Sequence, residues 1–304
     1  MKKVFLDASW MAYRAHYTTR QLAHNDIPTG VVFGFLGQLK TVCLDPQVQS
    51  NQVHVFFDSR RSLRRLYYPD YKRTPHRTER TPEERESLAT MYEQLNKLRR
   101  SILPKLGVPV YRQTGLEADD LIAMACATVG WDDSAVIISA DKDLLQCVRA
   151  NVSWYNPASE KGPVDLLSFK EEYGISPDFW GDVKAIAGCA GDGVKGVPGV
   201  GEKSAVAYLI GNLPEDGKRY KAIVSPEGQS TQLRNHELVK LPHRRTAPFE
   251  LEELRWDADA FRELCREFGM EDFVRYDGGW GGWSRVFEGG IPNHTPRRRK
   301  RYDD

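Results

Sequence analysis

Three short apolar segments, each rich in Val, Ile or Phe and each ending in an aspartate, constrain the fold most strongly. They are residues 3–7 (KVFLD), 53–58 (VHVFFD) and 135–141 (AVIISAD). Buried parallel strands have this composition, and helical patterns separate the three segments. We therefore predict an α/β fold with a mostly parallel central sheet flanked by helices. Ligands of such sheets bind beyond the carboxyl ends of the strands, where all three aspartates would lie.

Composition excludes several classes of protein. The 304 residues are 40% hydrophobic and 28% charged, which is typical of one large or two small globular domains. The five cysteines are scattered and form no CxxC pair, which argues against a disulfide framework or a zinc knuckle. No segment is typical of a signal peptide or a membrane span. We therefore expect a soluble, cytoplasmic protein that does not bind membranes.

The net charge of +1 hides an uneven distribution of charge along the chain. Residues 60–80 contain eight Lys or Arg and two acids, whereas residues 115–145 contain seven acids and one lysine. The basic segment suits a polyanion and the acidic one a metal cation, although a solvated helix face also explains the former. Three interleaved tyrosines favour nucleic acid, since bases stack on such rings. The residues singled out are Arg64, Arg65, Tyr67, Tyr68 and Tyr71.

The sequence GLEADDLIAMA (residues 115–125) allows two interpretations. Acids near a helix start are favoured by the helix dipole, so Glu117, Asp119 and Asp120 could simply stabilise a helix. The apolar residues that follow fit one helical face. However, this helix follows a further predicted strand, VPVYRQ, and so begins at the same sheet edge as the three aspartates. That convergence favours a metal site.

Other segments indicate where helices and turns lie. Residues 81–84 (TPEE) combine an N-cap, a Pro and a capping-box Glu, and they open a helix whose apolar face runs to Ile102. Residues 176–178 (SPD) open another helix that runs to about residue 187. We also expect a helix over 258–275, a turn or linker at 278–283 and a disordered basic tail at 296–304. The tail is interpreted as a solvated terminus, with attraction to DNA as the alternative.

Residues 187–210 predict a glycine hairpin between two helices. Backbone N–H groups at the start of the second helix, together with Lys203, suit the phosphates of one DNA strand without reading its sequence. A generic glycine-rich turn is the alternative. The candidate DNA-binding residues here are Gly196, Gly199, Gly201 and Lys203.

The carboxylates expected at the sheet edge form one candidate metal site. So many acids in one pocket would raise one another's pKa values unless cations were present. Mg²⁺ prefers oxygen ligands, and two such ions can stabilise the attacking and leaving oxygens of a phosphodiester displacement. The candidate ligands are Asp7, Asp58, Glu117, Asp119, Asp120, Asp141, Asp143 and Asp192.

Several motifs in order resemble one family. The motifs are VFLDAS, MAYR, VFFD, YYPDYK, EADD, SADKDLLQ and DGVKGVPGVGEK, within residues 3–210. Together they resemble the phage and bacterial 5′→3′ exonuclease/flap endonuclease family, which includes the 5′-nuclease domain of bacterial DNA polymerase I. The resemblance implies a PIN-like nuclease core with a helical arch and a helix–three-turn–helix element that grips duplex DNA. No polymerase domain follows, so we expect a stand-alone, phage-type enzyme in the host cytoplasm.

The resemblance also implies roles for particular residues. Asp143 and Asp192 would serve a second metal, and the other six acids would hold or order the first. Lys72 would contact the scissile phosphate and Tyr71 would stack on a terminal base. Arg73 or Arg77 would take the place of an arginine that the family has after the lysine. The hairpin carbonyls would be a site for K⁺.

One position departs from the family pattern G-D-x-x-D. Residues 188–192 read GCAGD, so Cys189 stands where the first Asp is expected. Cysteine is a soft ligand and suits Mg²⁺ poorly. Three interpretations stay open: a water fills the position, Mn²⁺ is better tolerated, or endonucleolytic activity is weakened. We favour a packing role for Cys189 over a ligand role.

We therefore expect a structure-specific 5′ nuclease that uses one or two Mg²⁺ or Mn²⁺ ions. Its substrates would be DNA 5′ ends, flaps or RNA primers during replication and repair. A DNA-junction binding protein with little catalysis, caused by Cys189, is the main alternative. A nuclease acting mainly on RNA is another, against which the hairpin argues. A phosphatase with Asp7 as nucleophile is disfavoured by Ser9, which stands where that chemistry usually has a second Asp.

The expected organisation has three parts. Residues 1–175 would form the nuclease core, with the arch at about 60–85. Residues 176–285 would form a helical DNA-binding region, and residues 286–304 the basic tail. We expect a monomer, with a replication protein such as a polymerase or a single-strand binding protein as a candidate partner.

Overall fold

A five-stranded, wholly parallel sheet forms the centre of the protein. The structure is a computed structural model, and it describes residues 1–275 and 280–287. The sheet confirms the predicted α/β architecture, and only its last strand, a short segment with two aromatic residues, was not predicted. In sheet order the strands are β5 (Val110–Tyr111), β4 (Gln52–Phe56), β1 (Lys2–Asp7), β6 (Ser134–Ile138) and β7 (Val152–Tyr155).

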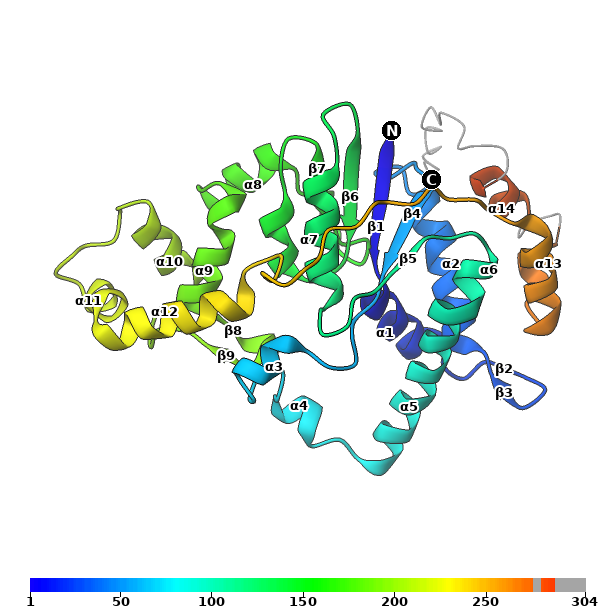
Figure 1. The fold of residues 1–304 in the computed structure, drawn as a ribbon, viewed down its shortest axis with the longest axis horizontal. Helices are drawn as coiled ribbons and strands as arrows, with labels where there is room; N and C mark the ends of the chain where they lie inside the picture. Colours follow the sequence, from blue (N-terminus) through cyan, green and yellow to red (C-terminus); the bar gives the residue numbers. More distant parts are fainter. Residues whose placement is uncertain (276–279, 288–304) are drawn as a thin grey trace, which may run out of the picture.

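The register of the central strands brings their carboxyl ends to one edge. Leu6 of β1 pairs with Val55 of β4 and with Ile138 of β6. The chain therefore reaches Asp7, Asp58 and Asp141 at the same side of the sheet, as the sequence predicts. In Figure 1 this edge faces the side on which α3, α4 and α5 lie.

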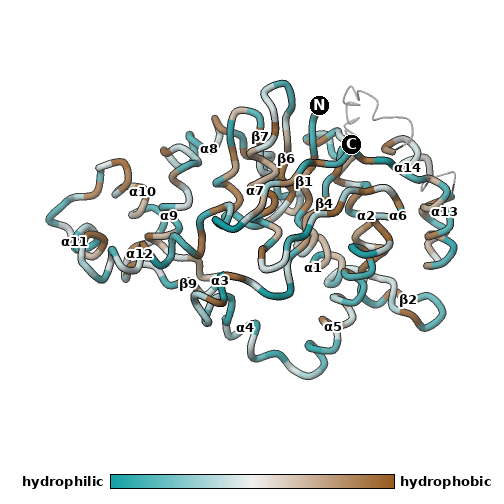
Figure 2. The backbone as a smooth tube through the Cα atoms, viewed as in Figure 1, coloured by the Kyte–Doolittle hydropathy of each residue, from teal (hydrophilic) through white to brown (hydrophobic). Residues whose placement is uncertain are grey.

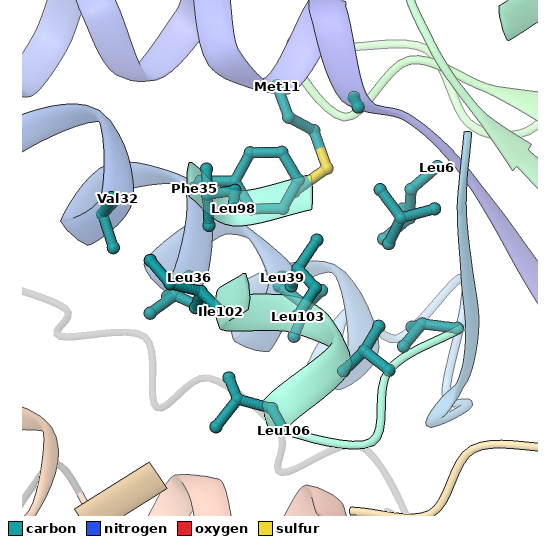
Figure 3. Packing of buried hydrophobic residues seen from close by; sticks show 14 of the residues in the cluster. Leu6, Met11, Val32, Phe35, Leu36, Leu39, Leu98, Ile102, Leu103 and Leu106 are labelled. Atoms are coloured by element: carbon teal, nitrogen blue, oxygen red, sulfur yellow. The ribbon is translucent and has the colours of Figure 1, made fainter. Parts of the chain in front are cut away.

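Helices from the N-terminal part of the chain and from its C-terminal end cover one face of the sheet (Figure 1). Val4 and Leu6 point to this face and Phe5 to the other, because side chains alternate along a strand. Figure 3 shows the resulting core, in which Met11, Phe35 and Leu39 lie near Leu6. The helices of this layer are α1 (Ala8–Thr19), α2 (Gly30–Leu44), α5 (Pro82–Lys97), α6 (Leu103–Lys105), α13 (Ala258–Glu267) and α14 (Trp280–Phe287), with the π-helical turn η1 (Leu98–Ile102).

The opposite face is covered by α7 and by the helices that follow β7. The apolar positions predicted for α7, among them Leu121 and Ile122, are fully buried here. The helices of this layer are α7 (Ala118–Thr128), α8 (Leu166–Tyr173), α9 (Trp180–Ala187), α10 (Glu202–Leu209) and α11 (Lys218–Val224). Two 3₁₀ helices complete it, η2 (Lys142–Cys147) and η3 (Pro177–Phe179).

Helix α5 begins where its capping signals place it. The Thr81 hydroxyl accepts the Glu84 N–H at 3.2 Å, and the Glu84 carboxylate accepts the Thr81 N–H at 2.9 Å. Its predicted apolar face is buried, and Met91 and Leu98 are fully so. The helix predicted from residue 176 divides into η3 and α9, with the boundary at Trp180.

Two expectations about the C-terminal part are corrected. Helix α13 ends at Glu267 and not at 275, because Gly269 adopts φ +63 and reverses the chain. Residues 280–283 are not a linker, since they begin α14, in which Trp283 is fully buried against α13 and its neighbours. Residues 278–279 and the basic tail at 296–304 lie outside the described residues. Because α13 and α14 pack on the α2 side, they lie with the first layer.

The basic segment (residues 60–80) contains two short helices, α3 (Leu63–Tyr67) and α4 (Pro75–Thr78). Figure 2 shows that most residues from α4 to the start of α5 are hydrophilic. The segment leaves the sheet after β4 and returns through α5. It therefore crosses the side of the molecule where the aspartates lie.

The predicted glycine hairpin lies between α9 and α10. Strands β8 (Gly188–Cys189) and β9 (Val194–Lys195) pair antiparallel around the turn η4 (Ala190–Asp192). Helix α12 (Pro226–Val239) packs along α9. A second small hairpin joins β2 (Ala23–His24) to β3 (Ile27–Pro28). No helix within the described ranges has the length and apolar character needed to cross a membrane.

Candidate metal centre and nucleic-acid interface

Carboxylates from four elements meet at the carboxyl edge of the sheet. Asp7 ends β1 and caps α1, Asp58 follows β4, Asp119 lies in the first turn of α7, and Asp141 caps η2. Burial, followed by the charges of Asp141 and Asp7, raises the pKa of Asp119 well above its usual value. The acids are thus close enough to repel one another, as the sequence predicted.

Asp7 is the most constrained of these four acids. One carboxylate oxygen accepts the Trp10 N–H at 3.1 Å, and the other accepts the Ser139 hydroxyl at 2.9 Å. Burial and the charge of Asp58 nevertheless raise its pKa to about 7. The two hydrogen bonds fix the direction of the side chain but leave much of its negative charge unbalanced.

Two serines that the sequence reasoning missed orient the acids. Ser139 is fully buried and accepts the Asp141 N–H at 3.1 Å while it donates to Asp7. Ser9 donates to Asp58, whose second oxygen accepts the Ala118 N–H at 2.8 Å. The signal was present, because each serine lies within two residues of a predicted ligand in VFLDAS or SADKD.

Glu117 and Asp192 connect the acidic edge to the basic segment. The Lys72 ammonium lies 2.9 Å from a Glu117 carboxylate oxygen and 3.8 Å from Asp192. Burial alone would raise the pKa of Glu117, but the charges of Lys72 and Arg64 outweigh it and hold the pKa at about 2. Glu117 is therefore a carboxylate at neutral pH, and Lys72 reaches the predicted site.

Tyr71 is buried beside the acids. Its side chain is only 3% exposed, and its hydroxyl contacts Glu117 at 2.9 Å and Asp192 at 3.2 Å. Burial raises its pKa well above the usual value, so it stays a hydrogen-bond donor. The buried ring belongs to an apolar cluster with Val194 and Leu238, and its stacking on a terminal base stays a prediction.

The two candidate arginines of the basic segment differ. A guanidinium nitrogen of Arg77 lies 3.7 Å from Asp192, whereas Arg73 pairs with Asp70 at 3.9 Å and is 61% exposed. Geometry therefore favours Arg77 for the role next to Lys72. Arg65, predicted as a DNA contact, donates to the backbone carbonyls of Tyr71 at 3.0 Å and Lys72 at 3.3 Å.

Asp120 and Arg64 form a buried pair apart from the other acids. Two guanidinium nitrogens of Arg64 donate to the two oxygens of Asp120 at 2.7 and 2.8 Å. Asp120 is 0% exposed and Arg64 is 3% exposed. Asp120 is thus paired with a cation of the chain itself, and the burial of Arg64 does not favour the predicted DNA contact. Asp120 instead accepts the Glu117 N–H and so orders that loop.

Asp143, Cys189 and Asp192 form a second group of potential ligands. One ligand atom from each lies within 4.8 Å of the others, so this group could hold a divalent ion. The Cys189 thiol is thus at the site that the family pattern implied. Lys184, which the sequence reasoning missed, is buried and lies 3.2 Å from Asp143 and 2.9 Å from Glu202. Lysine in an apolar helix gave no signal of this role.

The glycines of the hairpin differ in whether the structure requires glycine at their positions. A Cβ on Gly196 would lie 2.2 Å from the Ala187 backbone, so this position requires glycine. Gly199 has φ +75 with open space around it, and Gly201 also faces open space. Lys203 is exposed at the start of α10. The hairpin and the basic segment together line a hollow of about 670 Å³, with Arg73 and Thr74 on one side and Gly196 on the other.

The donor set fits a divalent cation. Within the part of the chain that the structure describes, Lys72, Arg77 and Lys184 pair with Glu117, Asp192 and Asp143. No such partner is present there for the four acids that meet at the sheet edge. Burial and neighbouring carboxylates raise the pKa values of Asp7, Asp119 and Asp141, and a hard divalent cation such as Mg²⁺ or Mn²⁺ would relieve that repulsion. The acids that form no ion pair with a described residue are Asp7, Asp58, Asp119 and Asp141.

Comparison with known proteins identifies the family. The family described as "5'-3' exonuclease, N-terminal resolvase-like domain" matches residues 2–174. The chain belongs to this family. That finding confirms the family that the motifs resemble.

Curated relatives agree with this family. The 5'-3' exonuclease of Buchnera aphidicola is 27% identical over 210 residues, which cover 68% of this chain and 69% of the relative. The DNA polymerase I of Bacillus caldotenax is 28% identical over 293 residues and 90% of this chain. The chain spans only 32% of that polymerase's length.

Solved structures share the fold. T5 5'-exonuclease with bound divalent zinc ions has a TM-score of 0.65 at 21% identity, covering 80% of this chain and 90% of that one. Human GEN1 in complex with Holliday junction DNA has a TM-score of 0.54 at 16% identity, covering 88% of this chain and 68% of that one. These likenesses support the parallel sheet with flanking helices as the shared architecture.

Proposed function

We propose that this member of the 5′–3′ exonuclease family is a metal-dependent, structure-specific 5′ nuclease. It would hydrolyse phosphodiesters near DNA 5′ ends, flaps or RNA primers. The observation that carries the proposal is the group of four carboxylates at the sheet edge that have no ion-pair partner among the described residues, with the Lys72 ammonium near them. That arrangement suits a divalent ion and an anionic substrate at one place.

The chain's own residues would divide the work. Asp7, Asp58, Asp119 and Asp141 would hold a divalent ion, for which Mg²⁺ and Mn²⁺ are the candidates. A bound ion stabilises the negative charge that develops on the phosphoryl oxygens. Lys72 would exchange its contact with Glu117 for the scissile phosphate, and Arg77 would support it. Ser9 and Ser139 would keep the acids oriented.

The group of Asp143, Cys189 and Asp192 determines whether a second divalent ion can bind. Asp143 and Asp192 would contribute to a second site in which Cys189 is a weak ligand for Mg²⁺. Lys184 already offsets part of the charge of Asp143. We therefore propose that Mg²⁺ binds weakly at the second site, and that Mn²⁺ is better tolerated there.

DNA would lie across the hairpin and the basic segment. The Gly201 turn and the exposed Lys203 would contact phosphates of one duplex strand, and the hollow beside Gly196 would accept the backbone. In this proposal residues 60–85 form the arch above the acids, and residues 176–240, the first part of the helical region predicted at 176–285, form the helix–three-turn–helix element. Membership of the family, and the fold shared with human GEN1 as solved in complex with Holliday junction DNA, support this assignment.

The proposal is tested with a 5′-flap DNA labelled at either end and incubated with pure protein in Mg²⁺, Mn²⁺ or EDTA. We expect cleavage near the junction in either metal and none in EDTA. Tight binding without cleavage in both metals would refute the nuclease and favour a junction-binding protein. A matched RNA flap serves as a control for sugar preference.

A further inference from the structure

The conformation of Lys72 needs external support. Its φ is +57, a left-handed conformation that residues other than glycine adopt at a cost. Its N–H donates to the Asp192 carbonyl at 2.7 Å, which ties the turn to the hairpin. Such a conformation persists only where surrounding contacts hold it in place.

Arg65 supplies part of that support. Its guanidinium donates to the carbonyls of Tyr71 and Lys72, the two peptide groups that flank the turn. These bonds draw the turn toward α3, and from there the Lys72 side chain reaches Glu117. The exposed guanidinium of Arg65 thus acts on the backbone of the basic segment.

Arg64, the preceding residue, fixes α3 itself. Besides its two bonds to Asp120, its Nε donates to the Leu238 carbonyl at 2.7 Å and an Nη to the Lys240 carbonyl at 3.3 Å. Asp120 accepts the His243 N–H at 2.8 Å in addition. The guanidinium therefore joins the basic segment to the acidic helix α7, to the end of α12 and to the chain that follows it.

The planar, multiply bonded guanidinium is not replaceable by lysine here. An ammonium is a compact charge and cannot make a two-pronged pair with Asp120 while it also reaches two carbonyls. Loss of these bonds would loosen α3 relative to Glu117. The distance between Lys72 and the acids would then no longer be fixed.

We propose that Arg64 and Arg65 are positioning residues for the reaction: Arg64 fixes α3 to the acidic helix, and Arg65 holds the turn that aims Lys72. The inference rests on the proposed nuclease function. Neither residue touches the substrate, and both act through Lys72. A displacement of about 1 Å at a reacting group can lower kcat roughly 100-fold.

The test compares R64K and R65A with the unmodified protein on the 5′-flap DNA. We expect kcat to fall roughly 100-fold in R64K and roughly tenfold in R65A, with KM changed little. In a K72A background, neither change should lower kcat further, because the residue through which both act is gone. Arg65 is exposed, so we expect R65A to fold, and it keeps the test valid if R64K is unstable.

Arg149 provides a matched control at the other end of α7. Its guanidinium donates to the carbonyls of Cys126 and Val129. R149K should lower the melting temperature while kcat stays unchanged. Normal kcat in R64K and R65A, or a rise in KM alone, would overturn the inference. Absence of cleavage by the unmodified protein would instead refute the proposed function.

Discussion

The carboxylate of Asp119 lowers the stability of the metal-free protein. The pKa of Asp119 in the folded protein lies well above its unfolded value of 3.8. The unfolded chain therefore ionises more readily, and the free energy of unfolding falls as pH rises above 3.8. We expect D119N to raise the melting temperature of the metal-free protein at pH 7, and to lower cleavage by roughly 10³-fold or more. Thermal unfolding in EDTA and flap cleavage in Mg²⁺ measure the two effects. D132N, at an exposed loop position, is the control and should change neither.

Cys189 is the position at which metal preference can be tuned. C189D would add a hard carboxylate beside Asp143 and Asp192, and we expect it to lower the Mg²⁺ concentration for half-maximal cleavage about tenfold. C189S has nearly the same volume without a charge and serves as the control. A metal titration of cleavage checks the prediction. Equal Mg²⁺ requirements for the two variants would contradict it.

His54 makes stability depend on pH away from the site. Burial and then the charge of Lys3 lower its pKa to about 4, against 6.5 in the unfolded chain. The unfolded state therefore binds a proton between these values while the folded state does not. Stability is full above pH 6.5 and is lost as pH falls toward 4, by at most about 3 kcal/mol.

The variant H54F tests this assignment. Phe keeps the ring contacts with Phe5 and Tyr111 but has no titratable group. We expect denaturant unfolding of H54F to lose less stability between pH 6.5 and 4 than the unmodified protein does. If the free energy of unfolding fell equally with pH in the two proteins, His54 would not be the cause of the loss of stability.

At the scale of elements, the hairpin distinguishes glycines that look alike in sequence. G196A would place a methyl group against the backbone of Ala187, and we expect it to distort β8–β9 and weaken duplex binding about tenfold or more. G201A meets open space at φ −102 and should bind DNA almost normally. Fluorescence anisotropy with duplex DNA in EDTA compares the two. Similar affinities would contradict the structural reading of Gly196.

The elements themselves were largely predictable. Strand β1 has an apolar run and helix α5 has a capping box. Both signals are local, so the residues of each element are enough to predict its conformation. Helix α14 was missed because its glycine-rich sequence has poor helix propensity. Its conformation depends on burial of Trp283 among aromatic side chains from distant residues.

At the scale of the whole molecule, α14 joins the end of the described chain to the first layer. Trp283 is fully buried, and its ring lies 5.5 Å from that of Trp256 and 4.4 Å from that of Phe261. W283A should lower the free energy of unfolding by about 3–5 kcal/mol. W283F should cost much less, since the indole N–H has no partner among the described residues. Urea denaturation measures the free energy of unfolding of both variants. A W283A variant as stable as the unmodified protein would refute this packing role.

The sequence by itself determined the parallel sheet and the edge at which the acids meet. Alternation and apolar runs are local, and Asp7 and Asp141 follow their strands directly, so the chain's order places them. The tertiary structure decided which acids stay free. Asp119 and Asp120 are neighbours, yet only Asp120 meets Arg64, because partners far apart in sequence are chosen by packing. Tyr71 is likewise buried by Leu238 and Val194, contacts that no local pattern encodes.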